Sequence, residues 1–196
     1  MKKILLLIFF AVFFVLNSSL SFAHVVGEEG SRSSEEKNME ASASAQKGSD
    51  YVLPYPGILS DNFLYFTKAI RDRIIEILMA DPVKKADFYL LSADKRLNEG
   101  VMLFEKGSSK YQLAETTISK GENYFEKGLS QIQTAKNQNL PVDSLIQKYH
   151  MSSHKHQEVI GGLIKRSSGN VKDGLVHSQK RAQGFGTMLE GFEPKK

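Results

Sequence analysis

Apolar residues recur at spacings of three and four along most of the chain after residue 50, a pattern typical of helices that bury one face. The first such stretch predicts a helix over residues 61–80, capped by Ser60 or Asp61. Its charged positions define a polar face: Lys68, Arg71, Asp72, Arg73 and Glu76. Its apolar positions form one stripe, through which we expect the helix to pack: Phe63, Phe66, Ile70, Ile74 and Ile77.

Asp81-Pro82 predicts the start of a second helix, because aspartate caps a helix N-terminus and proline fits the first helical position. Gly107 then predicts its end. Between them an apolar seam repeats over three heptads, as in helices that pack side by side: Val83, Ala86, Leu90, Ala93, Leu97, Val101 and Phe104. A third helix over residues 110–136 should return beside the second as an antiparallel hairpin.

Two further stretches complete the helical pattern. Residues 142–167 predict a fourth helix after the loop at Pro141, and residues 171–189 allow a fifth that its own glycines would weaken. The expected fold is therefore an all-α antiparallel bundle of four to five helices. Three glycines inside the second and third helices suit such a bundle only where helices approach closely: Gly100, Gly121 and Gly128.

The stretch at residues 51–60, which we call the proline segment, is not expected to be helical. Pro54 and Pro56 favour extended backbone, and Gly57 permits a turn. We expect this segment to fold over the helix ends as a collar. Its aromatic residues and those just after it would then pack in the core instead of forming a ligand platform: Tyr51, Tyr55, Phe63, Tyr65 and Phe66.

The first 50 residues have the layout of an export signal followed by a linker. Lys2 and Lys3 precede an unbroken apolar run over residues 4–16, and small residues precede a cleavage point after Ala23. Residues 24–50 contain serines and charges but no aromatic residue, so they lack the apolar surface needed to fold. The predicted organisation is a signal peptide at 1–23, a disordered linker at 24–50 and a helical-bundle domain at 51–192 with its core at 51–136.

Composition, net charge and the absence of cysteine exclude several classes of function for this chain. Of the 196 residues, 41% are hydrophobic and 24% are charged, which is ordinary for a globular protein. The net charge of +4 falls to +2 without Lys2 and Lys3, because 24 basic residues then face 22 acidic ones, so the charge gives no nucleic-acid signature. The absence of cysteine excludes disulfides, thiolate metal sites and cysteine nucleophiles.

Residues 51–73 read Tyr-Val-Leu-Pro-Tyr-Pro-Gly-Ile-Leu-Ser-Asp-Asn-Phe-Leu-Tyr-Phe-Thr-Lys-Ala-Ile-Arg-Asp-Arg, and Asp81-Pro-Val-Lys-Lys-Ala-Asp and Ala93-Asp-Lys-Arg-Leu follow. Over residues 51–129 the chain resembles a family of exported bacterial proteins known only as a domain of unknown function. That family has a pattern like L-P-Y-P-G-(I/L)-L-P-D-(N/S)-P-L-Y-x-L-K before several helices, and Ser60 and Phe63 replace two of its prolines. The resemblance implies an all-helical, secreted or membrane-tethered domain and brings no catalytic residues.

The histidines form the sharpest candidate site. His150 and His154 are four residues apart, so a helix would place their rings on one face, where they could bind a divalent metal ion. A third ligand would come from His156, from His177 or from Glu158. The alternative is that these are surface histidines, with His156 partly buried in the helical seam. No cofactor is implied.

Other charged groups suggest weaker sites. Carboxylate pairs such as Glu122 and Glu126, or the group Glu76, Asp81 and Asp87, could serve acid–base chemistry, although solvated helix faces produce such pairs often. The basic C-terminal tail could contact an anionic membrane surface, or simply be a solvated face: Lys155, Lys165, Arg166, Lys172, Lys180 and Arg181.

The sequence thus predicts a non-enzymatic helical bundle that is secreted or periplasmic, or is anchored by an uncleaved N-terminal segment. We expect it to act by protein interaction or as a structural module in the cell envelope, with a protein partner or a homo-oligomer and no nucleic acid. Peripheral membrane contact would come from the basic tail. The alternative is an extracytoplasmic metal- or small-ligand-binding bundle that uses His150 and His154.

Overall fold

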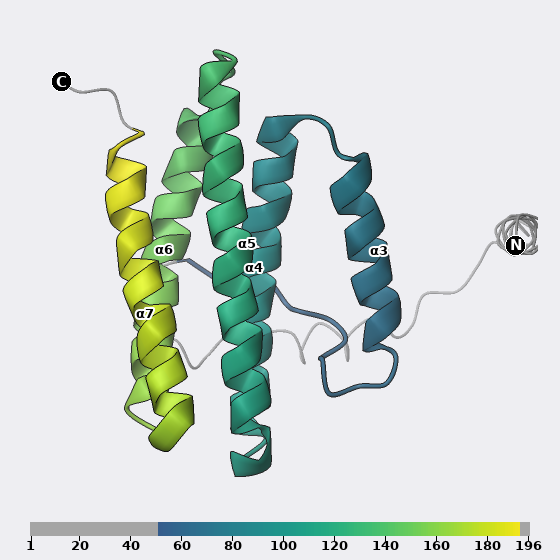
Figure 1. Cartoon of the computed structure of the whole chain (residues 1–196), viewed down its shortest axis with the longest axis vertical. Coiled ribbons are helices and arrows are strands. Elements are labelled where there is room, and N and C mark those ends of the chain that lie inside the picture. Colours follow the sequence, from purple (N-terminus) through teal and green to yellow (C-terminus); the bar gives the residue numbers. More distant parts are fainter. Residues whose placement is uncertain (1–50, 193–196) are drawn as a thin grey trace, which may run out of the picture. The chain divides into compact units, whose positions relative to one another are not determined.

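The computed structural model describes residues 51–192, and every regular element within them is a helix (Figure 1). In chain order these are α3 (Tyr65–Leu78), α4 (Pro82–Glu105), the short 3₁₀ helix η1 (Ser108–Lys110), α5 (Tyr111–Asn137), α6 (Asp143–Ile164) and α7 (Gly169–Glu190). The all-α prediction is confirmed, with five α-helices in the described residues. The predicted signal peptide and linker lie outside these residues.

The start and end of α4 follow the predicted signals. Asp81 Oδ1 accepts hydrogen bonds from the backbone N–H groups of Val83 at 2.9 Å and Lys84 at 3.3 Å, and Pro82 begins the helix. The helix ends just before Gly107, whose φ of +105° favours glycine. After η1 the chain reverses, so that α5 runs antiparallel to α4 as the predicted hairpin (Figure 1).

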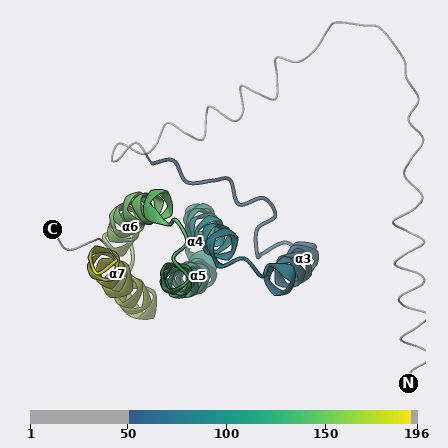
Figure 2. The same ribbon diagram turned by 90° about the horizontal axis from the view of Figure 1, so that it is seen from above.

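Helices α4 to α7 share one core. Within it, α4 packs against α5 and α6, and α7 packs against the same two helices (Figure 2). The Phe125 ring stacks on Phe185 of α7 with 4.5 Å between centroids and meets Tyr149 of α6 edge-on at 4.9 Å. Helix α7 forms despite its glycines because one side of it is buried in this core, through Leu175, Ala182, Phe185 and Leu189.

The three helix glycines mark close helix contacts. A Cβ atom at Gly121 would lie 3.1 Å from the Ala93 carbonyl oxygen and from Arg96 Cβ on α4. A Cβ at Gly128 would overlap the Tyr149 hydroxyl, and one at Gly100 would overlap the Ile118 side chain. A larger residue at Gly121 would press on the α4 backbone, whereas at Gly100 or Gly128 it would displace a packed side chain.

The packing expected of the first helix is wrong. The exposed fractions of its stripe residues are 85% for Phe63, 52% for Phe66, 55% for Ile70, 51% for Ile74 and 68% for Ile77. Among the described residues of α3, the one buried side chain is that of Glu76, which belongs to the predicted polar face. The helix thus turns its polar side to the bundle, and Figure 2 shows it standing beside α4 and α5, away from α6 and α7.

The collar expected of the proline segment is also wrong, because this segment runs along the side of α4. Tyr51 donates a hydrogen bond to Asp94, the Asn98 side chain donates one to the Pro54 carbonyl at 3.0 Å, and the Ser60 N–H donates one to Glu99 at 2.6 Å. Three of the five aromatic residues expected in the core are instead exposed: Tyr55, Phe63 and Phe66. Extended backbone leaves N–H and C=O groups free to form hydrogen bonds with polar α4 side chains, and these bonds hold the segment along the length of α4.

The expected cap of the first helix does not form. Helix α3 begins at Tyr65, and the residue before it, Leu64, makes no capping hydrogen bond through its side chain. Asp61 instead accepts a hydrogen bond from Lys106 Nζ at 2.8 Å, which ties the turn before α3 to the end of α4.

Candidate functional site

One buried polar cluster joins three helices, and it consists of His156, Asp94 and Glu122. His156 on α6 is fully buried. Its Nδ1 lies 2.8 Å from Glu122 Oε1 on α5, and its Nε2 lies 3.1 Å from Asp94 Oδ1 on α4. Both ring nitrogens can donate to these oxygens at once only when the imidazole is protonated.

The charges of the cluster favour that protonated form. Burial by itself lowers the pKa of His156, but the charge of Glu122 and the hydrogen bonds with both carboxylates outweigh it and raise the pKa to about 9. The ring therefore carries a positive charge at neutral pH, between two acidic side chains.

Further hydrogen bonds complete the surroundings of Asp94. Ser152 on α6 donates to Asp94 Oδ1 at 2.5 Å, and Tyr51 of the proline segment donates to Oδ2 at 2.5 Å. Burial, and next the charge of Asp94, raise the pKa of the Tyr51 hydroxyl, so it stays a donor. Glu122 Oε2 is buried and accepts no hydrogen bond within the described residues. The cluster can hold a proton, and it ties three helices and the proline segment together.

The predicted metal ligands are only partly brought together. His150, half-buried, and His154, exposed, share one face of α6, whereas both His156 nitrogens face carboxylates and His177 is exposed on α7. Glu158 pairs with Lys155 at 3.2 Å. Residues 51–192 contain no group of three or more histidine or carboxylate side chains arranged to hold a metal ion. A metal site built from His150, His154, His156 and His177 stays a prediction.

The carboxylates considered for acid–base chemistry each have a structural partner. Asp81 caps α4, and Asp87 pairs with Lys148 at 3.1 Å. Glu126 binds Arg181 at 2.9 Å, which links α5 to α7. These contacts give the acidic residues a part in holding helices in place.

Polar contacts attach α3 to the bundle. Glu76 Oε1 accepts hydrogen bonds from the Tyr89 hydroxyl at 2.8 Å and from Lys127 Nζ at 3.0 Å. Burial raises the pKa of Glu76, but these bonds and one from Arg73 outweigh it and lower the pKa to about 2. The helix is thus clamped near its C-terminal end by a charged side chain.

A second clamp lies near the beginning of α3. Lys68 Nζ donates to the Pro56 carbonyl at 2.7 Å and pairs with the buried Glu99 carboxylate at 3.8 Å. The Arg96 guanidinium lies 5.0 Å from the centroid of the Tyr65 ring. Like the first clamp, this one holds the helix by polar groups.

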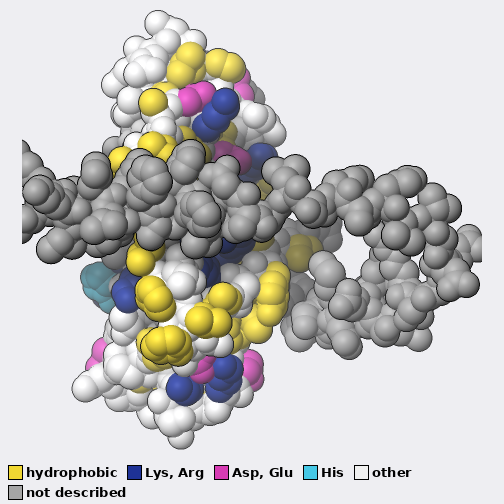
Figure 3. All heavy atoms as spheres, turned by 90° about the vertical axis from the view of Figure 1, so that its right-hand side faces the viewer, with side chains coloured by type: hydrophobic (Ala, Val, Ile, Leu, Met, Phe, Trp, Pro, Cys, Tyr) yellow, Lys and Arg dark blue, Asp and Glu magenta, His cyan; other side chains and the backbone are white. Residues whose placement is uncertain are grey.

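The opposite side of the helix is an exposed apolar surface, the α3 apolar face. It consists of Phe63 in the preceding turn and of Phe66, Ile70, Ile74 and Ile77. A space-filling view of the side that carries α3 shows hydrophobic side chains next to lysine and arginine side chains (Figure 3). Contiguous apolar patches of more than a few hundred Å² are uncommon on monomeric proteins and often mark interaction sites.

The charges on α3 are distributed unevenly around this face. The side chains of Arg71 and Arg73 are each 65% exposed, whereas those of Asp72 and Glu76 are 23% and 11% exposed. With 100° of rotation per residue, the two arginines lie on opposite flanks of the stripe. The solvent side of α3 is therefore apolar with positive flanks.

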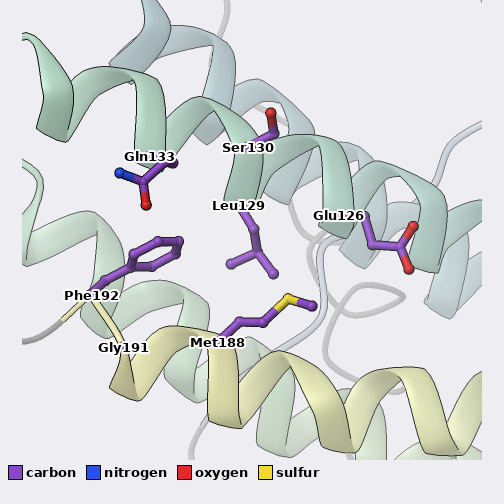
Figure 4. A pocket seen from close by; sticks show the side chains of 7 residues that line it. All are labelled: Glu126, Leu129, Ser130, Gln133, Met188, Gly191 and Phe192. Atoms are coloured by element: carbon purple, nitrogen blue, oxygen red, sulfur yellow. The ribbon is translucent and has the colours of Figure 1, made fainter.

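A shallow groove of about 540 Å³ lies between α5 and the end of α7 (Figure 4). Its floor is apolar, formed by Leu129, Met188 and Phe192, with Glu126 and Gln133 at its edge. The Lys136 ammonium donates to the Phe192 carbonyl and so holds the turn after α7 against α5. Of the candidate residues named from the sequence, only Glu126 lines this groove, and none of the histidines does.

Several cations of the basic tail are engaged within the bundle. Lys155 is buried beside Glu158, Arg166 makes two hydrogen bonds to Glu105 at 2.6 and 3.0 Å, and Arg181 binds Glu126. The remaining three are exposed on α7 or just before it: Lys165, Lys172 and Lys180. In the part of the chain that the structure describes, no helix is long and apolar enough to cross a membrane.

Residues 57–168 match the family described as "Domain of unknown function (DUF5667)". The match runs from the turn at Gly57 through α3, α4, α5 and α6, so it includes the α3 apolar face and the buried polar cluster. Residues 51–56, with the first part of the proline motif, lie outside it. Comparison with curated proteins and with solved structures finds no match.

Proposed function

Because the chain belongs to a family described only as a domain of unknown function (DUF5667), we propose its function from its geometry. It is an exported helical-bundle module that acts by contact through the α3 apolar face, without catalysis. The observation that carries this proposal is the orientation of α3, which turns Glu76 and Lys68 to the bundle and its apolar stripe to solvent.

The hydrophobic effect supplies the driving force for such contact. Burying apolar surface is worth about 25 cal/mol per Å², and Phe63 and Phe66 alone would contribute on the order of 250 Å². The polar clamps keep the face presented outwards, because swinging the stripe towards the bundle would break the bonds of Glu76 and Lys68. The bundle thus serves as the rigid support of a binding surface.

Export is the second part of the proposal. The positive residues, apolar run and small residues before position 24 have the order of a secretory signal, and the chain has no cysteine to be oxidised outside the cytoplasm. Mass spectrometry of the chain recovered from envelope and culture fluid tests this. A product that begins at His24 is expected, or an intact N-terminus in the membrane fraction if the segment remains as an anchor.

Site-specific photocrosslinking in living cells tests the contact surface. A photoreactive residue placed at Ile74 should form a discrete adduct, whereas the same residue at Met151 should not. Met151 is a matched control because it is an apolar α6 residue with a similar exposed fraction, 49% against 51%. Equal crosslinking at the two positions, or no crosslink to protein or to lipid at position 74, would contradict a role for the α3 apolar face.

A further inference from the structure

We propose that the α3 apolar face docks on the surface of an anionic lipid bilayer, with α3 lying parallel to that surface. This inference rests on the proposed contact function and names the occupant of the same face. The other possible occupants are a second copy of the chain, which charge and area disfavour, and a protein partner, which the test below distinguishes.

The charge around the face matches anionic headgroups. Arg71 and Arg73 are the most exposed charges of α3 and lie on opposite flanks of the stripe. Each is ion-paired with a less exposed acid, Asp72 at 2.8 Å and Glu76 at 2.9 Å, but both arginine side chains remain 65% exposed. When the stripe enters the boundary between headgroups and acyl chains, both guanidinium groups reach the headgroup level. Such flanking cations strengthen binding to anionic lipid.

The position of α3 allows the bundle to stay in water during docking. The stripe lies on the side of the helix opposite Glu76 and Lys68, which hold the bundle. With 14 residues, α3 is about 21 Å long, too short to cross a bilayer but long enough to lie along its surface. No other part of the described chain needs to enter the lipid.

A second copy fits the face less well. A two-fold axis that pairs the stripes of two α3 helices would also bring together the arginine flanks of both copies, because exposed acidic side chains are lacking beside this stripe within the described residues. Like charges across an interface weaken association. Five side chains per copy would also bury an area near or below the lower end for specific interfaces, about 1,200 Å².

The order of the chain supports the same occupant. The apolar run over residues 4–16 is expected to enter a membrane during export, and α3 is the first helix of the described domain after it. A chain still attached by that run would hold α3 near the lipid at a high effective concentration.

A tryptophan reporter on α3 tests the docking in the full chain, which has no tryptophan of its own. The I74W variant and the control variant M151W are mixed with phosphatidylglycerol-rich vesicles and with phosphatidylcholine vesicles. With the anionic vesicles, I74W emission should shift to shorter wavelength and be quenched by brominated acyl chains, and M151W emission should not change. Because the probe is local, insertion of residues 4–16 does not produce this signal.

Removing the two arginines and adding salt test whether charge contributes to vesicle binding. Replacing both Arg71 and Arg73 by glutamine in the I74W variant should weaken vesicle binding on the order of ten- to thirtyfold, and added salt should weaken binding of the parent variant. Unchanged circular dichroism and Tm show that each variant is folded. Absence of a vesicle effect on folded I74W overturns the proposal.

The outcomes also separate this proposal from the contact function on which it rests. A photoadduct at position 74 with a protein, without any vesicle effect on I74W, keeps the contact function and removes the bilayer. Analytical ultracentrifugation identifies the case in which that protein is a second copy. Absence of both the adduct and the vesicle effect removes the two proposals together.

Discussion

His156 keeps a positive charge inside the bundle because two acidic side chains face its ring nitrogens. Removing either acid would leave a buried ion with fewer partners, which is costly in a low-dielectric interior. At the scale of single residues the bundle is therefore specified by this polar cluster as well as by its apolar core.

The raised pKa of His156 predicts a pH-dependent stability. The pKa rises from an ordinary 6.5 to about 9 on folding, so the stabilisation is complete below the unfolded value and is lost as pH rises through 9. A shift of this size corresponds to about 3 kcal/mol of unfolding free energy. Urea unfolding at pH 6, 8 and 10, together with NMR titration of the ring, measures both quantities.

The matched variant is Glu122→Gln, which keeps a hydrogen-bonding oxygen but removes the charge. The pKa of His156 and the slope of stability against pH should both fall in this variant. If His156 titrates near 6.5 in the native chain, this description of the cluster is incorrect.

Gly128 and Gly184 give opposite predictions for the same substitution. Gly128→Ala places a methyl group on the Tyr149 hydroxyl and should lower stability by about 1–3 kcal/mol. Gly184→Ala meets no atom within 4 Å and should raise stability by about 0.5–1 kcal/mol, since alanine favours the helix. Thermal unfolding of both variants measures the difference. Equal effects would contradict the close approach of the Tyr149 hydroxyl to Gly128.

The sequence indicated that His156 would be partly buried but not what would surround it. Asp94 and Glu122 are 62 and 34 residues away along the chain, so only the packing of three helices brings them to its ring. A usable signal was present, because Glu122 lies between the apolar α5 residues Ile118 and Phe125, and Asp94 follows the seam residue Ala93. Acidic residues at such positions indicate a buried partner.

At the scale of elements, α3 differs from the other helices in how it is held. Helices α4 to α7 bury apolar side chains against one another, whereas α3 relies on Glu76, Lys68 and Tyr65. Hydrogen bonds contribute about 1 kcal/mol each on balance, less than the burial of a large apolar side chain. We therefore expect α3 to open at lower free energy than the bundle.

Substitutions in the apolar stripe of α3 and in the apolar seam of α4 should differ in their effect on the unfolding free energy. Ile70→Gln removes an exposed side chain from α3 and should change the unfolding free energy by less than about 0.5 kcal/mol. Leu97→Ala creates a cavity in the core and should lower it by about 2–5 kcal/mol. Denaturant unfolding compares them. A loss of several kcal/mol for Ile70→Gln would place the stripe in the core.

Weakening one clamp should release α3 alone. Glu76→Gln removes the charge that binds Lys127 and Arg73, so amide hydrogen exchange in α3 should accelerate several-fold while exchange in α5 stays unchanged. Asp87→Asn is the matched control, because it removes an exposed ion pair with Lys148 away from α3. Equal acceleration in α5 would show that α3 opens only when the bundle unfolds.

Helix positions were more predictable than helix orientation. The Asp81-Pro82 start and the Gly107 end of α4 depend on local backbone chemistry, and both were confirmed. The apolar stripe predicted for α3 is also present, but the spacing of apolar residues does not indicate whether other parts of the same chain bury that stripe. Glu76 and Lys68 decided the orientation, and their partners lie on α4, α5 and the proline segment.

At the scale of the whole molecule, a four-helix core supports an outlying helix that presents an apolar surface (Figure 2). The bundle needs nothing further to bury its own seam, so the stripe of α3 is available to an external surface. The central claim is thus that the α3 apolar face is open to solvent in the free, folded chain.

Thiol labelling tests this claim most directly, because the chain has no cysteine. The single-cysteine variants I74C and L97C are treated with a maleimide under native conditions, and monomers are confirmed by light scattering. We predict that I74C reacts at nearly the rate of the unfolded chain, whereas L97C, at a fully buried position, is protected. Protection of I74C equal to that of L97C in the folded monomer would contradict the account.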